Sequence, residues 1–237
     1  MSPYFQCNQS VDRLCVQFFR NKSCIELSKA LLGQILCRRL SPDGPILKGR
    51  IVETEAYLGV EDKSCHSYGG RRTKRNEPMF MSSGTTYVYF TYGMYYCFNL
   101  SAEDEGSVVL LRAVQPLQAI DFMNEFRTNF MKRRHESSGH TCHETKKCDP
   151  KPYKLKALAN GPSKLCICFH INKDNMNKVD ITDSPFIWIE RADCVSPQDI
   201  VCDKRIGLSG DHEWVDKELR LRAIDCIPCT SLGSRVV

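Results

Sequence analysis

The sequence lacks an apolar run long enough to cross a lipid bilayer, and its mean hydropathy is −0.36. Residues 1–10 lack the basic start and the apolar stretch of a secretory signal. No internal repeat is evident either. These absences argue against membrane and secreted proteins, and we expect the 237 residues to form a soluble protein with one sizeable core.

The 14 cysteines also lack the doubled pattern of a structural zinc site. The two candidate zinc spacings are a lone Cys-x-x-Cys at 226–229 and a polar loop that contains His140, Cys142, His143 and Cys148. Several cysteines lie inside apolar runs such as 167–169, so reduced thiols are a better interpretation than a disulfide scaffold. A zinc-stabilised interaction protein that uses the 140–148 loop stays open as an alternative.

The charge balance favours a polyanionic partner. The chain carries a formal net charge of +5 and has a pI of about 8.5. From charge alone, a basic surface that binds no anionic partner is an equally good interpretation, because many basic proteins bind nothing anionic. The 42% hydrophobic and 26% charged residues are ordinary values for a globular protein.

Hydrophobic periodicity and turn residues predict a single mixed α/β (α+β) domain over 1–237 with an antiparallel sheet. Ser23 and Glu26 fit a capping box for a helix that stops near Gly33. The strands 34–40 and 49–58 flank a Ser-Pro-Asp-Gly turn and predict a hairpin. The other expected elements are two strands meeting in a turn within 85–100, a central strand at 107–114, a helix at 118–134, a short helix after 160, and strands at 186–190 and 219–223.

Two segments interrupt this pattern. Residues 59–83 are polar and basic, and we interpret them as a long ordered loop. Residues 135–154 are polar and charged, lack aliphatic side chains and end in Asp-Pro-Lys-Pro followed by Tyr-Lys. We expect a disordered surface insertion there, because so little apolar surface cannot offset the entropy of ordering.

Glu53, Glu55 and Tyr57 are expected on one face of the strand 49–58, since successive side chains alternate. Two carboxylates on one face suit hydrolysis through a cationic transition state, because one of them can activate water. Spacing alone favours the alternative of an ordinary solvated strand face. His66 would come within reach if the following loop folds back, although a lone histidine is more often structural.

Tyrosines surround a Tyr-Gly-Met turn at 92–94, near the basic cluster of residues 71–75. Aromatic rings stack on bases and basic groups hold phosphates, so this combination suits nucleic-acid binding. The alternative is that about half of these tyrosines, Tyr87 among them, simply pack the sheet. Packing does not place a large aromatic at the tip of a turn, so Tyr92 is a candidate wedge between bases.

Several motifs occur in order along the chain: GRIVETEAYLG at 49–59, GGRRTKRN at 69–76, MF at 79–80, YVYFTYGMYYCFN at 87–99 and VLLRA at 109–113. GPSKLC at 161–166, IN-K at 171–173, and R-I-G with E-W at 205–214 follow. With these motifs the sequence resembles the alkyladenine (3-methyladenine, methylpurine) DNA glycosylases over roughly residues 24–225.

The resemblance implies a catalytic role for three residues and a pocket for a flipped base. Glu55 would be the general base that polarises the attacking water, assisted by Arg112 and the main-chain carbonyl of Ile206. Stacking and edge contacts with the base would come from Tyr57, His66, Tyr89 and Asn99.

The resemblance also implies how DNA is held. Tyr92 would fill the space that the flipped base leaves in the duplex, with Met94 and Tyr95 beside it on a protruding β-hairpin. The DNA backbone would be held by Arg71, Lys164 and Lys173. The acidic run 103–105 sits where a DNA-facing loop would lie and is expected to weaken binding.

The activity that follows from the resemblance is base-excision repair by a monofunctional N-glycosylase. Its substrates would be 3-methyladenine, 7-methylguanine, hypoxanthine and ethenoadenine in double-stranded DNA. We expect no cofactor, no metal and no membrane partner, a monomer, and a nuclear location. The alternative is a non-catalytic DNA-lesion-binding protein on the same scaffold, which would need the aromatic and basic features but not Glu55 or Arg112.

Overall fold

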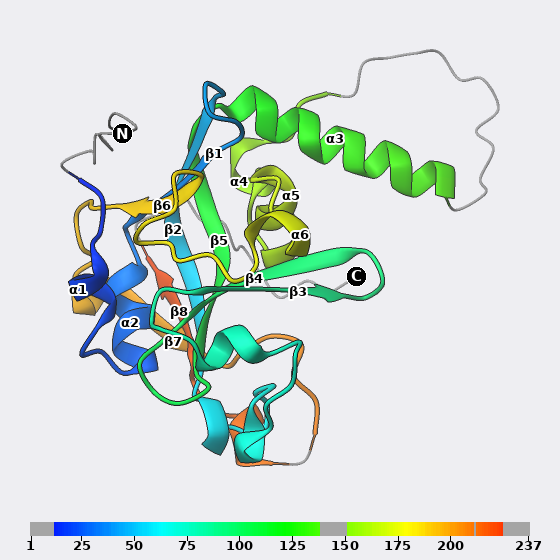
Figure 1. Ribbon diagram of the computed structural model, residues 1–237. Coiled ribbons are helices and arrows are strands. Elements are labelled where there is room, and N and C mark those ends of the chain that lie inside the picture. The colour runs from blue at the N-terminus through cyan, green and yellow to red at the C-terminus, as the bar shows by residue number, and fades with distance from the viewer. Residues whose placement is uncertain (1–11, 138–150, 211, 225–237) are drawn as a thin grey trace, which may run out of the picture.

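The longest strand, β2 (Ile46–Tyr57), organises a curled antiparallel sheet (Figure 1). Along one edge it pairs first with β1 (Ile35–Arg39) and then with β8 (Arg220–Ala223), and along the other with β5 (Val108–Gln118). Register shifts in the β2–β5 ladder between Ile51 and Thr54 mark a bulge, which bends the strand as it changes partner. This computed structural model describes residues 12–137, 151–210 and 212–224.

The sheet runs in the order β3-β4-β5-β2-β1-β6, and β8 joins β2 to β7. The β3–β4 hairpin extends away from the sheet below the long helix α3 (Figure 1). The remaining strands are β3 (Thr86–Thr91), β4 (Tyr95–Ser101), β6 (Ile187–Glu190) and β7 (Ile200–Asp203). The α-helices are α1 (Val16–Phe19), α2 (Cys24–Leu31), α3 (Ile120–Ser137), α4 (Leu155–Leu158), α5 (Pro162–Cys168) and α6 (Lys173–Met176). The 3-10 helices are η1 (Gly59–Glu61), η2 (Tyr68–Gly70), η3 (Glu77–Phe80), η4 (Pro197–Asp199) and η5 (Glu213–Val215).

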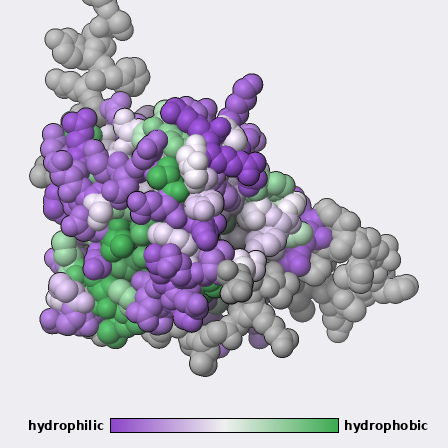
Figure 2. All heavy atoms as spheres, turned by 90° about the horizontal axis from the view of Figure 1, so that it is seen from below, coloured by the Kyte–Doolittle hydropathy of each residue, from purple (hydrophilic) through white to green (hydrophobic). Residues whose placement is uncertain are grey.

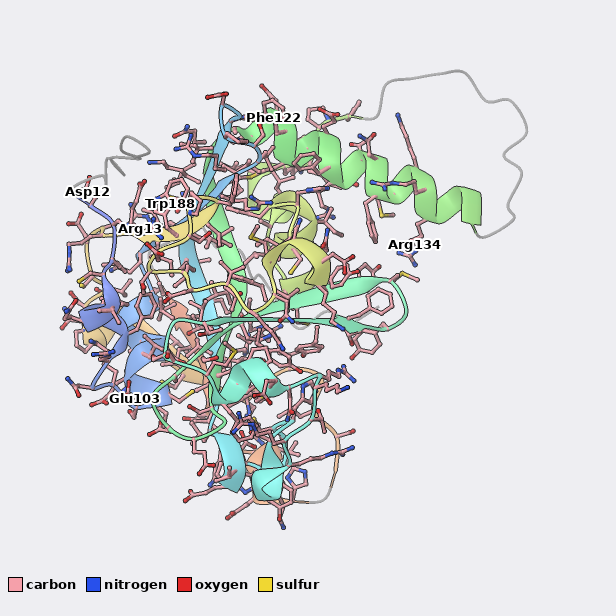
Figure 3. The ribbon with its side chains drawn as sticks, in the orientation of Figure 1. Asp12, Arg13, Glu103, Phe122, Arg134 and Trp188 are labelled. Carbon is pink, nitrogen blue, oxygen red and sulfur yellow. The ribbon has the colours of Figure 1, made fainter. Side chains whose placement is uncertain are left out.

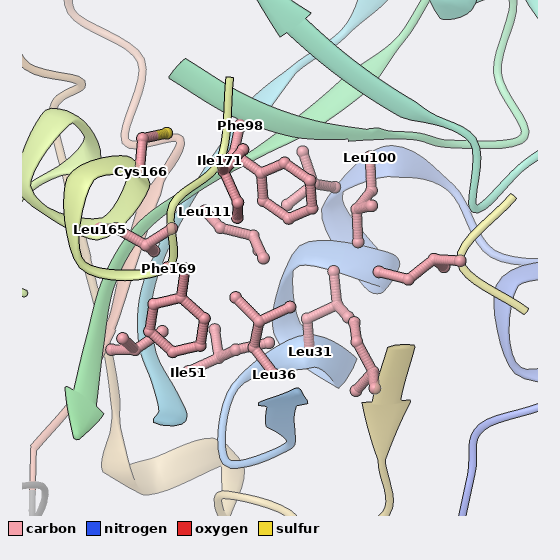
Figure 4. Close-up of a cluster of buried hydrophobic side chains, with 14 of the residues drawn as sticks. Leu31, Leu36, Ile51, Phe98, Leu100, Leu111, Leu165, Cys166, Phe169 and Ile171 are labelled. Carbon is pink, nitrogen blue, oxygen red and sulfur yellow. The ribbon is translucent and has the colours of Figure 1, made fainter. Parts of the chain in front are cut away.

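The hydrophobic core fills the space between the sheet, α2 and α5 (Figure 4). Leu31 from α2 and Phe169 at the end of α5 belong to the same buried cluster as Ile51 of β2 and Leu111 of β5. Burying such a side chain stabilises the fold by roughly 1.5–3 kcal/mol. The strand residues that alternate with this cluster face the opposite side of the sheet, where they are free to line a cavity.

The element predictions are confirmed in most places. Ser23 and Glu26 form the expected capping box at the start of α2. The hairpin β1–β2, the hairpin β3–β4, the central β5 and the strands β6 and β8 all lie within one to four residues of the predicted ranges. The loop 59–83 is ordered by three 3-10 turns. The short elements α1, α4, α6 and β7 were not predicted, because each is a single turn or a four-residue strand without a clear apolar pattern of its own.

The predicted insertion at 135–154 is too wide at both edges. The helix α3 continues to Ser137. Tyr153 packs against the core, and its N–H donates to the side chain of Asn124 over 2.8 Å. Residues 138–150 of that segment, and with them the His/Cys loop at 140–148, lie outside the described residues, as does the Cys-x-x-Cys pair at 226–229.

The surface is mixed in character. Seen from below, hydrophilic side chains cover most of the visible face, and hydrophobic ones gather in patches between them (Figure 2). Within the described part of the chain, no helix combines the length and the apolar character needed to span a membrane.

Candidate active site

A cavity of about 1260 Å³ opens on the face of the sheet opposite the core. It is bounded by β2, β3, β4 and β5, by α3 and the start of α5, and by the loop after β7. The aromatic and polar side chains in its wall include Glu53, Glu55, Tyr57, His66, Tyr87, Tyr89, Tyr92, Tyr95, Asn99, Arg112, Arg127, Phe130, Arg134, Lys164 and Arg220. The cavity therefore brings together residues that lie between Glu53 and Arg222 in the sequence.

Glu55 lies in the wall of this cavity with no exposed side-chain surface. Its Oε1 accepts a hydrogen bond from the main-chain N–H of Ile206 over 2.8 Å and forms an ion pair with Nη1 of Arg112 over 3.0 Å. Its Oε2 accepts one from the hydroxyl of Tyr57 over 2.9 Å. A carboxylate oxygen has capacity for about two donors, so Oε2 can still accept a hydrogen bond from a water molecule.

Arg112 bridges the two carboxylates of β2. Its Nε donates to Oε1 of Glu53 over 3.1 Å, and Arg220 reaches the same oxygen over 3.1 Å. Burial acts to lower the pKa of Arg112, but the neighbouring carboxylates of Glu55 and Glu53 outweigh it and raise that pKa above its ordinary value. The alternative of a solvated strand face is wrong, because Glu53 is only 2% exposed and Glu55 is fully buried.

Three rings meet above the carboxylates. The centroids of His66 and Tyr89 lie 4.8 Å apart in an edge-on arrangement, and those of Tyr87 and Tyr89 lie 5.2 Å apart. The loop that carries His66 does fold back onto the sheet, since Nδ1 of His66 lies 2.9 Å from the hydroxyl of Tyr87. Tyr87 is 1% exposed and belongs to a small core cluster, which confirms its packing role.

These rings stay uncharged near neutral pH. Burial lowers the pKa of His66, and the nearby Arg75 and Arg71 lower it further. Burial raises the pKa of Tyr87 to about 12 and places that of Tyr89 higher still. Burial, together with the Glu55 carboxylate, also holds the pKa of Tyr57 well above its usual range, so Tyr57 remains a phenol that donates to Glu55.

The tip of the β3–β4 hairpin exposes a large aromatic ring in an unfavourable backbone conformation. Tyr92 is 69% exposed and has a φ of 50°, and Gly93 follows with a φ of 66°. The N–H of Met94, which is also exposed, closes the turn onto the carbonyl of Thr91 over 3.2 Å. Two successive positive φ values are typical of hairpin turns that favour Asn-Gly, so tyrosine stabilises neither the turn nor the core here.

The helix α3 supports this hairpin, which the sequence did not predict. The ring of Phe130 stacks on Tyr95 with centroids 5.6 Å apart. Arg134 points from α3 towards the hairpin, and its Nη1 donates to the hydroxyl of Tyr95 over 3.2 Å (Figure 3). A helical pattern predicts which residues of α3 face the protein, but it cannot identify a partner 35 residues away.

Asn99 sits in the cavity wall and is held rigidly. It is 2% exposed on β4, opposite Tyr87 of β3, and its Nδ2 donates to the carbonyl of Tyr87 over 2.9 Å. Because this bond fixes the amide, the side chain cannot easily move aside for a larger ligand. The position is compatible with a contact to a base edge.

The basic residues differ in their placement. Lys164 lines the cavity, where Nζ donates to Oδ1 of Asn160 over 2.8 Å, and burial followed by Arg127 lowers its pKa. Arg71 and Lys173 are exposed, at the end of η2 and the start of α6, and neither lines the cavity. They are accessible to a ligand that extends beyond the cavity.

A second buried charge cluster lies behind the site and was not predicted. Arg205 forms an ion pair with Asp62, and neither side chain has exposed surface. The adjoining Ile206 contacts Glu55 through its N–H rather than through the carbonyl to which the resemblance assigns a role. The R-I-G motif was the signal that could have identified Arg205.

The nine cysteines in the described ranges are free thiols, as expected. Burial raises the pKa of those in the core, for example that of Cys24 to about 12. Among the described residues no group of three or more His, Cys, Asp or Glu side chains could hold a metal ion.

Comparison with known proteins identifies the family. The model of the methylpurine-DNA glycosylase (MPG) family matches residues 17–225. A protein of Encephalitozoon cuniculi named "Probable DNA-3-methyladenine glycosylase" is 43% identical over 217 residues, which cover 90% of this chain and 93% of that protein. The DNA-3-methyladenine glycosylase of Homo sapiens is 42% identical over 88% of this chain, which spans 64% of that protein. The DNA-3-methyladenine glycosylase of Mus musculus is 41% identical over 94% of this chain, which spans 62% of that protein. With most of its length matched in this way, the protein belongs to the methylpurine-DNA glycosylase family and is an enzyme of that class.

Proposed function

We propose that this enzyme flips a damaged purine out of double-stranded DNA and hydrolyses its N-glycosidic bond, with a water molecule activated by Glu55. A base inside the duplex is inaccessible, and extruding it costs a few kcal/mol. Tyr92 offsets part of that cost by filling the vacated space. Its exposure and its positive φ support this role, because neither contributes to the stability of the free protein.

The flipped base stacks between Tyr57 on one side and His66 with Tyr89 on the other. A cationic base such as 3-methyladenine or 7-methylguanine gains a cation–π term of about 0.5–2 kcal/mol from these rings. The lowered pKa of His66 supports this arrangement, since a neutral imidazole does not repel a cationic base. Hypoxanthine and ethenoadenine are neutral and depend more on edge contacts, and the buried position of Asn99 in the cavity wall supports a role for Asn99 in those contacts.

The chemical step uses the contacts of Glu55. Ile206 and Arg112 occupy Oε1, so the free capacity of Oε2 faces the attacking water beside the Tyr57 hydroxyl. The water oxygen bonds to C1′ of the sugar as the bond from C1′ to the base breaks, and the electron pair of that bond leaves with the base. The carboxylate accepts a proton from the water and then passes it to the departing base, or to solvent when the base was cationic. Its negative charge also stabilises the positive charge that develops on the sugar. The products are a free base and an abasic site.

The observation that carries this proposal is the buried Glu55, held by three donors at the wall of a cavity that is lined with aromatic rings. Burying a carboxylate costs free energy. A buried carboxylate in a cavity wall is therefore a candidate for a functional role that uses its charge and basicity. Arg71, Lys164 and Lys173 extend a positive surface for the DNA backbone. The similarity to the mammalian enzymes supports a nuclear location, which imaging of a fluorescent fusion would test.

The experiment is a panel of duplexes that each contain one lesion: hypoxanthine, ethenoadenine, 7-methylguanine or 3-methyladenine. Purified protein is incubated in excess, and the released base is measured by chromatography. Release from at least one damaged duplex, without release from the undamaged control, is the expected result. Tight binding to a lesion without any base release would instead favour the non-catalytic lesion-binding protein.

A further inference from the structure

Arg205 and Asp62 form a completely buried ion pair directly behind the proposed catalytic residues. Both terminal nitrogens of Arg205 contact the carboxylate, and the Nη2–Oδ1 distance is 3.0 Å. Arg205 does not line the cavity, and neither does Asp62. The pair therefore has no direct contact with a base in the cavity. Its function must depend on the main-chain segments that it holds in place.

The pair joins two segments that are distant in the sequence, residues 56–64 and residues 205–214. Arg205 donates to the carbonyl of Ala56 in β2 over 3.1 Å and to the carbonyl of Trp214 in η5 over 3.0 Å. Asp62 accepts the N–H groups of Leu58 over 3.2 Å and Ser64 over 2.9 Å. Thus the end of β2, the loop with η1 and the loop after β7 are fixed by one pair of side chains.

These contacts lie next to two of the three groups that bind Glu55. Ile206, whose N–H donates to Oε1, directly follows Arg205 in the chain. The guanidinium of Arg205 also lies 4.5 Å from the ring centroid of Tyr57, whose hydroxyl donates to Oε2. The carbonyl that Arg205 holds belongs to Ala56, the residue between Glu55 and Tyr57.

The energetics argue against a role in stability alone. Taking two charges out of water costs several kcal/mol, and well-packed apolar residues often stabilise such a position as well or better. Arg205 is neutralised by Asp62, so it is Arg112 that balances the charge of Glu55. The pair fixes the positions of the groups that contact Glu55. A displacement of about 1 Å of a catalytic group can lower the reaction rate about 100-fold.

We propose that the Arg205–Asp62 ion pair positions the Ile206 N–H and the Tyr57 side chain around Glu55, and so sets the rate of base release far more than the affinity for the lesion, to which it contributes only through the Tyr57 ring. This inference rests on the proposed function. Arg205 and Asp62 are positioning residues, because they act through Ile206 and Tyr57 rather than on the substrate.

The test compares Arg205→Lys and Asp62→Asn with a matched control, Arg38→Lys. Lysine cannot contact both carboxylate oxygens and two carbonyls at once, and asparagine removes the charge at constant size. Arg38 is also a buried arginine that donates to main-chain carbonyls, those of Arg39 and Phe186, but it lies outside the cavity wall. Single-turnover release of hypoxanthine, affinity for the hypoxanthine duplex and thermal melting are measured for each variant.

We expect the release rate to fall about 10- to 100-fold in both pair variants, with the Kd for the duplex changed less than about threefold. Arg38→Lys should melt at a lower temperature and keep the wild-type rate. Rates equal to that of the control, a parallel loss of rate and affinity, or failure of both pair variants to fold while the control folds would each overturn the proposal. Wild-type protein that releases no damaged base would instead contradict the proposed function itself.

Discussion

Replacing Glu55 by glutamine removes the charge and the basicity of the side chain while keeping its shape. The new amide oxygen can still accept from the Ile206 N–H and stay beside the Arg112 guanidinium, as Oε1 does now. The amide nitrogen then faces the hydroxyl of Tyr57, which can accept a hydrogen bond as well as donate one. The site should therefore keep its geometry and its ability to bind a lesion.

The expected loss lies in the chemical step. A positioned general base contributes about 10²- to 10⁴-fold, which corresponds to about 3–5 kcal/mol of transition-state stabilisation. We expect Glu55→Gln to lower the single-turnover rate by at least that factor, because the charge that stabilises the developing sugar cation is lost as well. The Kd for a hypoxanthine duplex should stay within about threefold of the wild-type value.

Glu53→Gln is the matched control on the same strand. Glu53 shares Arg112 with Glu55 but makes its second contact to Arg220, which also has Asp203 as a partner over 3.2 Å. This variant should lose about 1–3 kcal/mol of stability and less than tenfold in rate. Equal losses of rate in the two variants, or a wild-type rate in Glu55→Gln, would refute the assignment of Glu55 as the base.

Three further predictions concern Tyr92 at the hairpin tip, Asn99 in the cavity wall and the imidazole of His66. Tyr92→Asn should leave the melting temperature unchanged or raise it, since asparagine tolerates a positive φ, yet it should slow release from a paired duplex more than from a bulge. An equal deficit in both contexts would mark Tyr92 as structural. Asn99→Ser should raise the release of guanine relative to hypoxanthine in single-turnover assays, because the fixed amide no longer excludes the exocyclic amino group of guanine; an unchanged ratio would remove Asn99 from specificity. The pKa of His66 lies below the ordinary 6.5, so the folded state disfavours the imidazolium. The contribution of the neutral His66 to the free energy of unfolding is therefore full above pH 6.5, and it declines as the pH falls through the lowered pKa. Release of a cationic lesion should fall over the same range more than release of hypoxanthine, and a His66→Gln variant should lose that difference; equal pH profiles for both lesions would contradict it.

The sequence predicted the elements that carry strong local signals. The capping box at Ser23 and the alternation of 49–58 are local patterns, and both agree with the structure. Spacing correctly placed Glu53, Glu55 and Tyr57 on one face, but it favoured exposure to solvent. What it could not predict is that Arg112, from a strand more than 50 residues away, buries and pairs both carboxylates.

The positioning contacts were beyond local reasoning for the same reason. Phe130 and Arg134 looked like ordinary helix residues, yet they support Tyr95 on the hairpin. Arg205 stood out only as part of a motif, and its partner Asp62 lies 143 residues away. Propensity and periodicity act over a few residues, whereas these contacts depend on how the sheet curls.

The central claim is that a water molecule activated by Glu55 hydrolyses the N-glycosidic bond. Excision in ¹⁸O-labelled water tests this claim most directly. A hypoxanthine duplex is incubated with excess enzyme, and the released base and the sugar are analysed by mass spectrometry, with and without borohydride. The account predicts free hypoxanthine, one ¹⁸O atom at C1′ of an otherwise intact strand, and no covalent complex between protein and DNA. A borohydride-trapped complex, for example through Lys164 in the cavity wall, or an unchanged duplex would contradict it.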